Sequence, residues 1–266
     1  MIATQRIKST ASKPIPYKDY EAINVLKWSN SKWKTLCPYY LKTDGNEECA
    51  NPGGILFENY YQGLKVYPVI YPNVVYASWR HTGNPKYLWW KYEPVNSSDT
   101  STTDKKKQPS GDQIIDPSDG SFDKDLYLRW RTSLWACPNP IRYPNHIHKR
   151  GQTKFSLCID QQGNETRMDY ITARKKMYVK EYIRLIRKLP AYATLLSKLK
   201  AGTNLMLCEV DVPAMGKKGL YGKDIDNNNV WTGITLSRLE TMMDDPTEAF
   251  GHGLCIAYAL LLDMAT

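Results

Sequence analysis

The chain has 266 residues, 42% of them hydrophobic, which is enough to bury a core as one large domain or two small ones. Its formal net charge of +9 predicts attraction to polyanions such as nucleic acids or nucleotides, although excess lysine can also serve solubility alone. The longest apolar run, 254–262, is far shorter than the roughly 18 residues that span a bilayer, so the sequence predicts a soluble protein without a transmembrane helix.

The N-terminal segment is basic. Residues 1–16 contain three basic residues and no acidic one, and they lack the apolar core and cleavage pattern of a secretory signal. We therefore expect a flexible basic tail at 1–16, the alternative being an organelle transit segment. Residues 22–27 and 36–42 then have the composition of short strands or extended segments.

A short segment places three polar side chains at helical spacing among apolar and aromatic residues. In 57–65, Phe-Glu-Asn-Tyr-Tyr-Gln-Gly-Leu-Lys, the residues Glu58, Gln62 and Lys65 are at i, i+4 and i+7 and would project from one stripe of a helix. Burying an acid and an amine is costly unless they pair or serve chemistry. The pattern predicts either an ion pair across two helical turns or a site in which Lys65 is a nucleophile or anion ligand and Glu58 moves protons.

The composition changes abruptly between residues 94 and 121, where Ser, Thr, Asp, Lys, Gly and Pro replace residues that could be buried. We predict a flexible insertion at 94–121 within a single domain, rather than a domain boundary. Structured sequence resumes at 122–135, and 154–160 is typical of a strand that ends at a turn.

The strongest helix pattern begins after Asp169, the expected N-cap, and ends at Pro190. One side of this helix is basic. A solvated helix face explains the basic stripe, and a rail that binds phosphates is the alternative. The residues of the stripe are Lys176, Lys180, Arg184 and Arg187.

The last third of the chain contains a predicted buried strand, 204–212. Its alternation puts Glu209 and Asp211 on one face at the end of the strand. Such carboxylates either belong to a site or cap helices and bind loop amides. The other elements expected here are a loop at 213–230 and helices at 191–200, 236–243 and 254–263.

The histidines suggest one candidate anion site. His252 lies between two glycines ahead of the last predicted helix, where free amides and the helix dipole attract phosphate; a turn histidine without a ligand is the alternative. His146 and His148 would share one side of an extended segment, but no third ligand is near them in the sequence, and we predict no metal site. The sequence contains no P-loop, dinucleotide-binding or nucleophile-elbow motif.

The six cysteines are spread over the whole chain without C-x-x-C spacing. This distribution predicts neither a zinc site nor a disulfide framework. Cys158 and Cys208 lie in apolar, strand-like runs, where a reduced thiol behaves as a small core residue. The sequence therefore favours a reducing compartment, the cytoplasm.

At 36–40, Leu-Cys-Pro-Tyr-Tyr, and at 57–65 the chain resembles the NADAR superfamily of YbiA-like domains, whose pattern runs Leu-Ser-Asn-Phe-Tyr and then Val-Glu-His-aromatic-aromatic-Gln, followed by a lysine. Glu58, Gln62 and Lys65 match this pattern, whereas Asn59 stands where the family has histidine. Further segments that look like a divergent branch of the superfamily are 170–176, 202–205, 209–213 and 250–253.

For the fold, the resemblance implies α+β: a helix-rich single domain over residues 17–266 with a small β-sheet, YbiA-like. For the activity, it implies a ribosyl N-glycosidase that needs no cofactor or metal and acts on ADP-ribosylated guanine of nucleic acid or on a nucleotide-like metabolite. Lys65 would attack C1 of the ribose to form a transient imine, Glu58 would shuttle protons, and Asp211 would be a second carboxylate. The expected substrate contacts are Gln62, Tyr61, Asn59, Trp231 and His252.

A non-catalytic protein that binds nucleic acid or assembles with other chains is the alternative. The chain has 19 tyrosines and 8 tryptophans, which can stack on bases and are enriched at interfaces. The basic stripe of the helix after Asp169 would then contact the polyanion. Convergence of Glu58, Lys65 and Asp211 on one site would favour catalysis, and their dispersal would favour assembly.

Overall fold

The computed structural model describes residues 1–7, 13–26, 31–46, 48–70, 73–75, 87–88, 100–101, 111–142, 153–212 and 225–266. These residues form a mixed α+β fold. The chain divides into two compact units: unit 1 comprises residues 1–41 and 174–266, and unit 2 comprises residues 42–173. This division differs from the single domain that we expected over 17–266.

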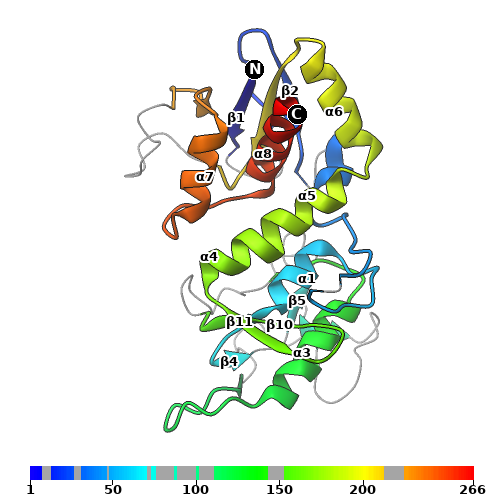
Figure 1. Ribbon diagram of the computed structural model, residues 1–266, viewed down its shortest axis with the longest axis vertical. Helices are drawn as coiled ribbons and strands as arrows, with labels where there is room; N and C mark the ends of the chain where they lie inside the picture. The colour runs from blue at the N-terminus through cyan, green and yellow to red at the C-terminus, as the bar shows by residue number, and fades with distance from the viewer. Residues whose placement is uncertain are drawn as a thin grey trace. The chain divides into compact units, whose positions relative to one another are not determined.

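The central sheet of unit 1 consists of β1 (Ile2–Arg6), β2 (Tyr20–Asn24), β12 (Asn204–Glu209) and β13 (Val230–Trp231) (Figure 1). The strand order is β13-β1-β12-β2. β12 pairs in parallel with both β1 and β2, while β13 pairs antiparallel with β1. Because parallel strands point the same way, the carboxyl ends of β1, β12 and β2 lie at one edge of the sheet.

Residues 2–6 are an inner strand, so the expectation of a flexible tail at 1–16 is wrong for these residues. Gln5 is only 1% exposed, and its side-chain amide donates to the carbonyl of Ile15 and accepts from the amide of Ile15. The polar residues of β1 suggested a solvated tail. Burial is tolerated because the flanking strands bond the backbone and Ile15 satisfies the glutamine amide.

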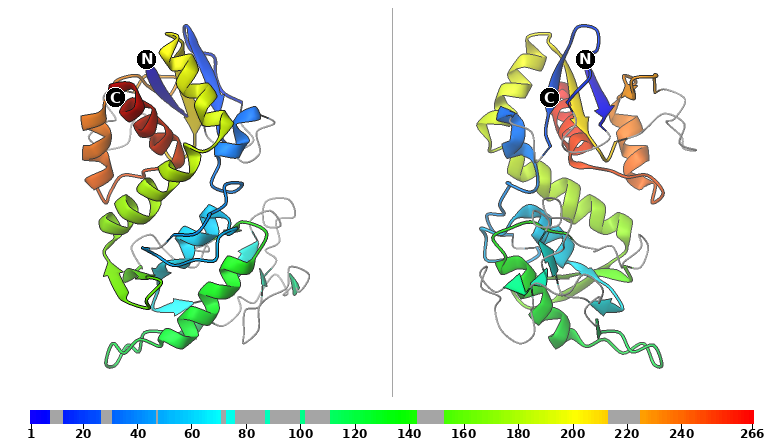
Figure 2. Two further views of the ribbon diagram at one scale, coloured as in Figure 1. Left: turned by 45° about the vertical axis from the view of Figure 1, so that its right-hand side comes forward. Right: turned by 180° about the vertical axis from the view of Figure 1, so that it is seen from behind.

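The α-helices described in unit 1 are α5 (Glu181–Ile186), α6 (Pro190–Lys200), α7 (Leu236–Asp244) and α8 (His252–Ala265). Helix α8 lies on a face of the sheet against β12 and β1, and the other three helices pack against α8 (Figure 2). The helices predicted at 191–200, 236–243 and 254–263 are confirmed, but the last begins at His252. Residues 36–42, expected to be a strand or extended, instead start at the last residue of a 3-10 helix, η1 (Lys32–Leu36), pass through a turn at 38–40 and form only an isolated β-bridge at Lys42.

The helix predicted after Asp169 consists of α4 (Tyr170–Ala173), a π-helix η2 (Arg174–Lys180) and α5. Asp169 is the cap, as predicted, since its Oδ1 accepts from the amide of Thr172 at 2.8 Å. Arg174 is buried, and its guanidinium donates to four carbonyls at the end of α7, those of Met242, Met243, Asp245 and Glu248. The guanidinium thus bonds carbonyls in the last turn of α7 and in the segment that follows it.

Unit 2 contains an antiparallel sheet of β3 (Lys65–Val66), β10 (Phe155–Ile159) and β11 (Glu165–Met168), in the order β11-β10-β3. The strand predicted at 154–160 is confirmed as β10. Helices α1 (Phe57–Gly63) and α3 (Lys124–Ala136) pack against each other. Val66 and Leu157 contribute one face of the sheet to a core that includes Tyr127, Trp130 and Leu134 of α3.

Shorter strands occupy other described parts of unit 2: β4 (Val69–Ile70), β5 (Asn73–Val75), β6 (Tyr87–Leu88), β7 (Thr100–Ser101), β8 (Asp112–Gln113) and β9 (Ile141–Arg142). β8 pairs with β4, and β7 pairs with β6. The described ends of the predicted insertion 94–121 are therefore paired strands, and Ile114 is buried in the core. Residues 102–110 lie outside the described ranges.

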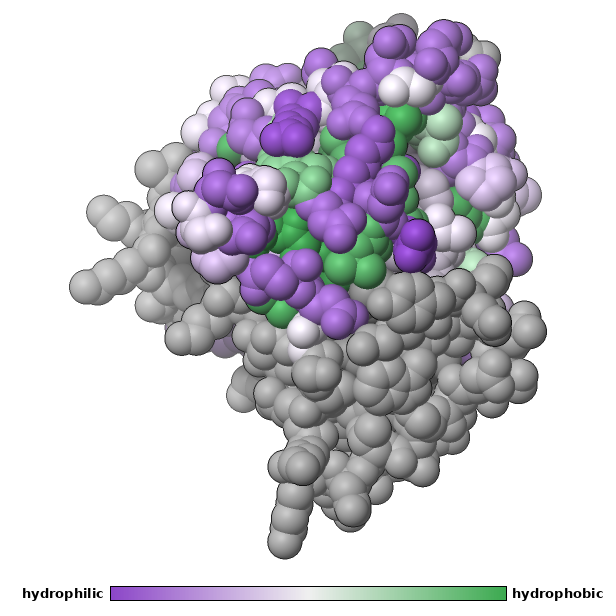
Figure 3. Space-filling view, turned by 90° about the horizontal axis from the view of Figure 1, so that it is seen from below, coloured by the Kyte–Doolittle hydropathy of each residue, from purple (hydrophilic) through white to green (hydrophobic). Residues whose placement is uncertain are grey.

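Large exposed hydrophobic side chains occur at scattered positions: Met1, Ile15, Tyr40, Tyr170 and Met264. On the face drawn in Figure 3, apolar residues lie between hydrophilic ones. Within the described ranges, no helix combines the length and the apolar composition needed to cross a membrane.

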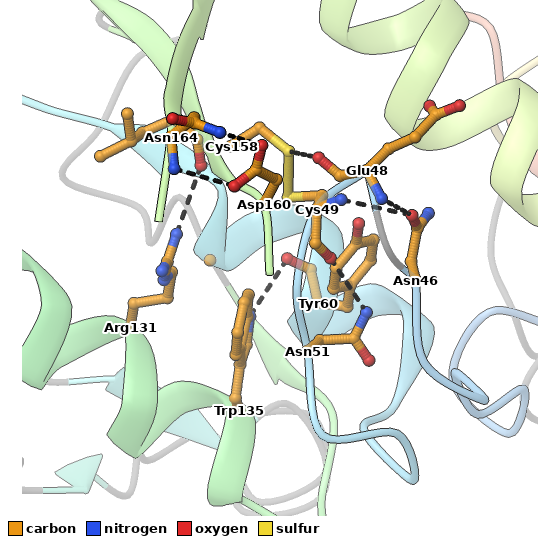
Figure 4. The surroundings of a disulfide bond; sticks show 12 residues. Asn46, Glu48, Cys49, Asn51, Tyr60, Arg131, Trp135, Cys158, Asp160 and Asn164 are labelled. Carbon is orange, nitrogen blue, oxygen red and sulfur yellow. Dashed lines mark hydrogen bonds between the residues drawn. A yellow bond between two sulfur atoms is a disulfide. The ribbon is translucent and has the colours of Figure 1, made fainter. Parts of the chain in front are cut away.

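The described residues of 42–56, which leave out residue 47, form a loop ahead of α1. Lys42 and Leu56 form a β-bridge, and a disulfide joins Cys49, within the loop, to Cys158 of β10 (Figure 4). The prediction of a reduced Cys158 and of no disulfide is therefore wrong. The two cysteines are separated by 109 positions, so local spacing carried no sign of their contact. Cys37, Cys137, Cys208 and Cys255 are free and buried.

Candidate functional site

Glu58, Gln62 and Lys65 are joined by hydrogen bonds in unit 2. The Lys65 amine donates to Oε1 of Gln62 at 2.9 Å, and Nε2 of Gln62 donates to Oε1 of Glu58 at 2.8 Å. All three side chains are half-buried. The glutamine therefore links the amine of Lys65 to the carboxylate of Glu58. The spacing in the sequence had predicted that the three side chains would lie on one face.

The backbone that positions Lys65 differs from the prediction, because α1 ends at Gly63 and Lys65 begins β3. Helix α3 closes the end of α1: the hydroxyl of Tyr127 donates to the carbonyl of Gly63 at 2.7 Å, and the indole of Trp135 donates to the carbonyl of Tyr60 at 3.2 Å. A Cβ on Gly63 would lie 2.5 Å from the indole nitrogen of Trp135, so only glycine allows this approach.

Lys65 lies on the face of the sheet opposite the core of unit 2. Its register partner on β10 is Ser156, whereas the adjacent pair Val66 and Phe155 faces the core. The Lys65 amine also lies 4.5 Å from the ring centre of Tyr61, which is 7% exposed. A cation over an aromatic face is stabilised, so Tyr61 and Gln62 together hold the Lys65 side chain in place.

Asn59, expected to contact substrate, is instead a structural residue. It is 0% exposed; its amide nitrogen donates to the carbonyls of Cys137 and Asn139, and its oxygen accepts from the amide of Ile141. These bonds hold the segment between α3 and β9 against α1. The asparagine amide has the two donors and the acceptor that this turn requires.

In unit 1, a second polar group lies at the carboxyl edge of the sheet. Nδ1 of His252 is 2.8 Å from Oε1 of Glu209, and Nε2 of His252 is 3.1 Å from the carbonyl oxygen of Val25. Oε2 of Glu209 accepts from the amide of Gly253 at 2.8 Å. The histidine therefore joins the end of β12 to the residue that follows β2, and the glutamate caps α8.

Two glycines leave room for this carboxylate. A Cβ on Gly251 would lie 2.6 Å from both oxygens of Glu209, and a Cβ on Gly253 would lie 2.9 Å from Oε2. The Gly-His-Gly sequence is therefore required by the close approach of Glu209. Asp211 is exposed, and its carbonyl accepts from the amide of Gly251 at 3.3 Å.

The pKa of His252 is raised beside Glu209. Burial by itself would lower the pKa of His252, but the Glu209 carboxylate, the carbonyl of Val25 and the charge of Asp211 outweigh burial and raise this pKa. Both ring nitrogens face acceptors, so a proton shared by the pair satisfies both contacts.

His252 was expected to help bind phosphate, and the structure corrects this interpretation. The Gly253 amide at the start of α8 already donates to Glu209, and both His252 nitrogens have partners within unit 1. Trp231 was expected to stack on the substrate. It is 0% exposed in β13, where its register partner is Thr4, so its ring is part of the core.

The predicted site residues thus fall into two sets. Glu58, Tyr61, Gln62 and Lys65 belong to unit 2, while Asp211, Trp231 and His252 belong to unit 1. Sequence reasoning missed the contact of His252 with Glu209, for which the only signal was the pair of glycines around the histidine. It also missed Tyr127 and Trp135, whose roles depend on the packing of α3 against α1.

Two residues of the predicted basic stripe are engaged in ion pairs. Arg184 makes two hydrogen bonds to Glu181, at 2.8 and 2.6 Å, and Arg187 bonds Asp263. Lys176 and Lys180 are exposed. The stripe is therefore in part a set of local ion pairs and in part a solvated face.

His146 and His148 lie outside the described ranges. Among the residues that the structure describes, there is no group of three or more His, Cys, Asp or Glu side chains that could hold a metal ion. Comparison of the chain with protein-family models, with curated proteins and with solved structures finds no match.

Proposed function

We propose that the protein is a ribosyl N-glycosidase of a divergent YbiA-like type, and that it cleaves the bond between ribose C1 and nitrogen in ADP-ribosylated guanine or in a nucleotide-like metabolite. The observation that supports this proposal is the linked set Lys65, Gln62 and Glu58. An amine beside a carboxylate in a half-buried setting suits nucleophilic catalysis. The resemblance of 36–40 and 57–65 to the NADAR superfamily supplies the substrate class.

The proposed reaction begins with the transfer of a proton from the Lys65 ammonium to Glu58. The neutral amine then attacks ribose C1, forming a nitrogen–carbon bond as the bond from C1 to the base nitrogen breaks. Glu58 returns the proton to the leaving nitrogen. Opening of the ribose ring yields an imine on Lys65, and water hydrolyses it to free the sugar and the amine.

Gln62 has to release the amine before this attack. Its oxygen accepts a hydrogen bond from Lys65, and an amide nitrogen does not relay protons readily. Substrate binding would therefore displace the Gln62 side chain, or a water would bridge Lys65 and Glu58. Asp211 lies in unit 1, so the proposed chemistry is assigned to Lys65 and Glu58 alone.

The test is capture of the imine. Incubation with an ADP-ribosylated guanine oligonucleotide and sodium cyanoborohydride should leave a stable sugar adduct on the peptide that contains Lys65, found by mass spectrometry. Lys65→Arg should abolish both the adduct and the release of ADP-ribose from the modified guanine. Lys154→Ala is the matched control, because Lys154 is an exposed lysine of the same unit next to β10. Turnover by Lys65→Arg at the wild-type rate would refute the proposal.

A non-catalytic polyanion-binding protein is the second candidate, and the exposed Lys176 and Lys180 favour it together with the net charge of +9. The two candidate functions predict different results with the modified oligonucleotide. Binding of unmodified nucleic acid without any cleavage of the modified oligonucleotide would support the second candidate over the glycosidase.

A further inference from the structure

The loop that contains Cys49 is folded by its own hydrogen bonds. Oδ1 of Asn46 accepts from the amides of Glu48 and Cys49, and Asn51 bonds the carbonyl of Cys49 and the amide of Gly53 (Figure 4). The ends of the loop are closed by hydrogen bonds between Thr43 and the backbone of residues 54 and 55. The loop therefore has a defined shape that is independent of the disulfide.

Two links join this loop to β10. The amide of Ala50 donates to the carbonyl of Ile159 at 2.7 Å, and the Cys49–Cys158 disulfide lies beside that bond. Both sulfur-bearing side chains are buried, Cys49 at 0% and Cys158 at 2% exposure. Sγ of Cys158 is also 3.0 Å from the carbonyl oxygen of Glu48, so a reduced thiol has an acceptor in place.

The disulfide lies on the same face of the sheet as Lys65. Phe155, Leu157 and Ile159 of β10 pack on the core of unit 2, so the alternate residues Ser156 and Cys158 face the other way. Ser156 is the register partner of Lys65. Cys158 is two residues farther along the strand, roughly 7 Å at the usual rise of a strand.

The loop is thus tied at one end to α1, which follows it directly and carries Glu58 and Gln62, and at Cys49 to the strand that pairs with Lys65. We propose that the Cys49–Cys158 disulfide is a redox-controlled clamp that holds the 42–56 loop on β10 and thereby fixes the alignment of the Lys65 face. In a reducing compartment the clamp opens, and under oxidising conditions it closes.

The redox step is a thiol–disulfide exchange. Opening transfers two electrons and two protons from a dithiol reductant, whose own thiols become a disulfide, to give the Cys49 and Cys158 thiols. Closing runs in the opposite direction with a disulfide such as oxidised glutathione, which leaves as two thiols. The free cysteines of unit 1 and Cys137 take no part.

The first test measures the loop itself. In the oxidised full-length protein, peptide mapping without reductant should find a cross-linked peptide containing Cys49 and Cys158. Addition of a dithiol should speed amide exchange at Ala50, whose bond to Ile159 lies beside the disulfide, by about tenfold or more, whereas exchange at Gly54, whose bond closes the loop itself, should change little. The Cys49→Ser variant should show the amide exchange rate of the reduced protein at Ala50, and this rate should not change when the dithiol is added. Cys137→Ser, a buried free cysteine of the same unit, should behave as wild type.

The second test concerns the site and rests on the proposed function. Reduction should lower the yield of the Lys65 adduct with cyanoborohydride, a reagent that leaves disulfides intact. If the amide exchange rates respond to the dithiol but no adduct forms in either the oxidised or the reduced protein, the proposal of a redox clamp is supported and the proposed glycosidase activity is refuted. Free thiols at both cysteines after treatment with oxidised glutathione, or unchanged exchange at Ala50, would overturn the clamp.

Discussion

Nδ1 of His252 lies 2.8 Å from Oε1 of Glu209, and both side chains are buried in unit 1. The pair joins the end of β12 to the start of α8, and the other ring nitrogen contacts the carbonyl of Val25. Tyr182 packs edge-on against the His252 ring, with ring centres 6.4 Å apart, and burial raises the pKa of Cys255 in the next turn of α8. Burial opposes the charged histidine, while Glu209, the carbonyl of Val25 and the charge of Asp211 favour it.

The stability of the protein should therefore fall at alkaline pH. The pKa of His252 is raised in the folded state, so its stabilising effect is complete below the pKa of an unfolded histidine, about 6.5, and is lost as pH rises through the folded pKa. Thermal unfolding of wild type and His252→Gln, measured from acid to alkaline pH, should show a difference that shrinks as pH increases. A difference that grows with pH would contradict the assignment.

Removal of the carboxylate should be more damaging than neutralisation of the histidine. Glu209→Ala leaves the histidine buried without its partner and uncaps Gly253, for which we expect a loss of about 3–5 kcal/mol in the free energy of unfolding. Chemical denaturation measures this loss. Asp211→Ala, which removes an exposed carboxylate next to the same site, is the control and should cost far less.

A double-mutant cycle should show that Gly251 is required by Glu209. The backbone of Gly251 has φ −80° and tolerates alanine, so the cost of Gly251→Ala arises from Cβ contacts, chiefly at 2.6 Å with both oxygens of Glu209 and to a lesser extent at 2.9 Å with Cβ of Asp211. We expect about 1–3 kcal/mol in the wild-type background. In the Glu209→Ala background most of this cost should disappear. If Gly251→Ala lowers the free energy of unfolding equally in both backgrounds, Glu209 is not the reason for glycine at this position.

Gln62 should matter for the proposed turnover more than for folding. Gln62→Ala removes the side chain that aligns Lys65 with Glu58 before substrate binds, so we expect kcat to fall by about 10²-fold with little change in melting temperature. Steady-state kinetics on the modified oligonucleotide measure this effect. Gln162→Ala, an exposed glutamine in a turn of the same unit, should retain wild-type kcat.

The basic stripe should divide into two classes. Lys176→Glu and Lys180→Glu should weaken polyanion binding and reduce its salt dependence by about one unit of slope each. Arg184→Glu should instead lower the melting temperature, because it places a second carboxylate against the buried Glu181. Binding isotherms at several salt concentrations, together with thermal scans, separate the two effects. Identical salt slopes for wild type and both lysine variants would leave the stripe as a solvated face.

Local patterns predicted the elements whose signals are local. The cap at Asp169, strands β10 and β12, and helices α6, α7 and α8 follow from periodicity and end signals over a few residues. The grouping of Glu58, Gln62 and Lys65 was also readable, because the three residues are close in the sequence. The end of helix α1 ahead of Lys65 could not be predicted, because it depends on hydrogen bonds from Tyr127 and Trp135 of α3 to the last carbonyls of α1.

By itself, the sequence determined local elements such as β10, α6, α7 and α8, because their periodicity and end signals lie within a few residues. Tertiary structure decided the contacts between distant residues: the central place of β1, the burial of Trp231 and the pairing of Glu209 with His252. It also decided the Cys49–Cys158 link. Such contacts form between segments that fold against each other, and their energies depend on burial and partners that no single segment contains.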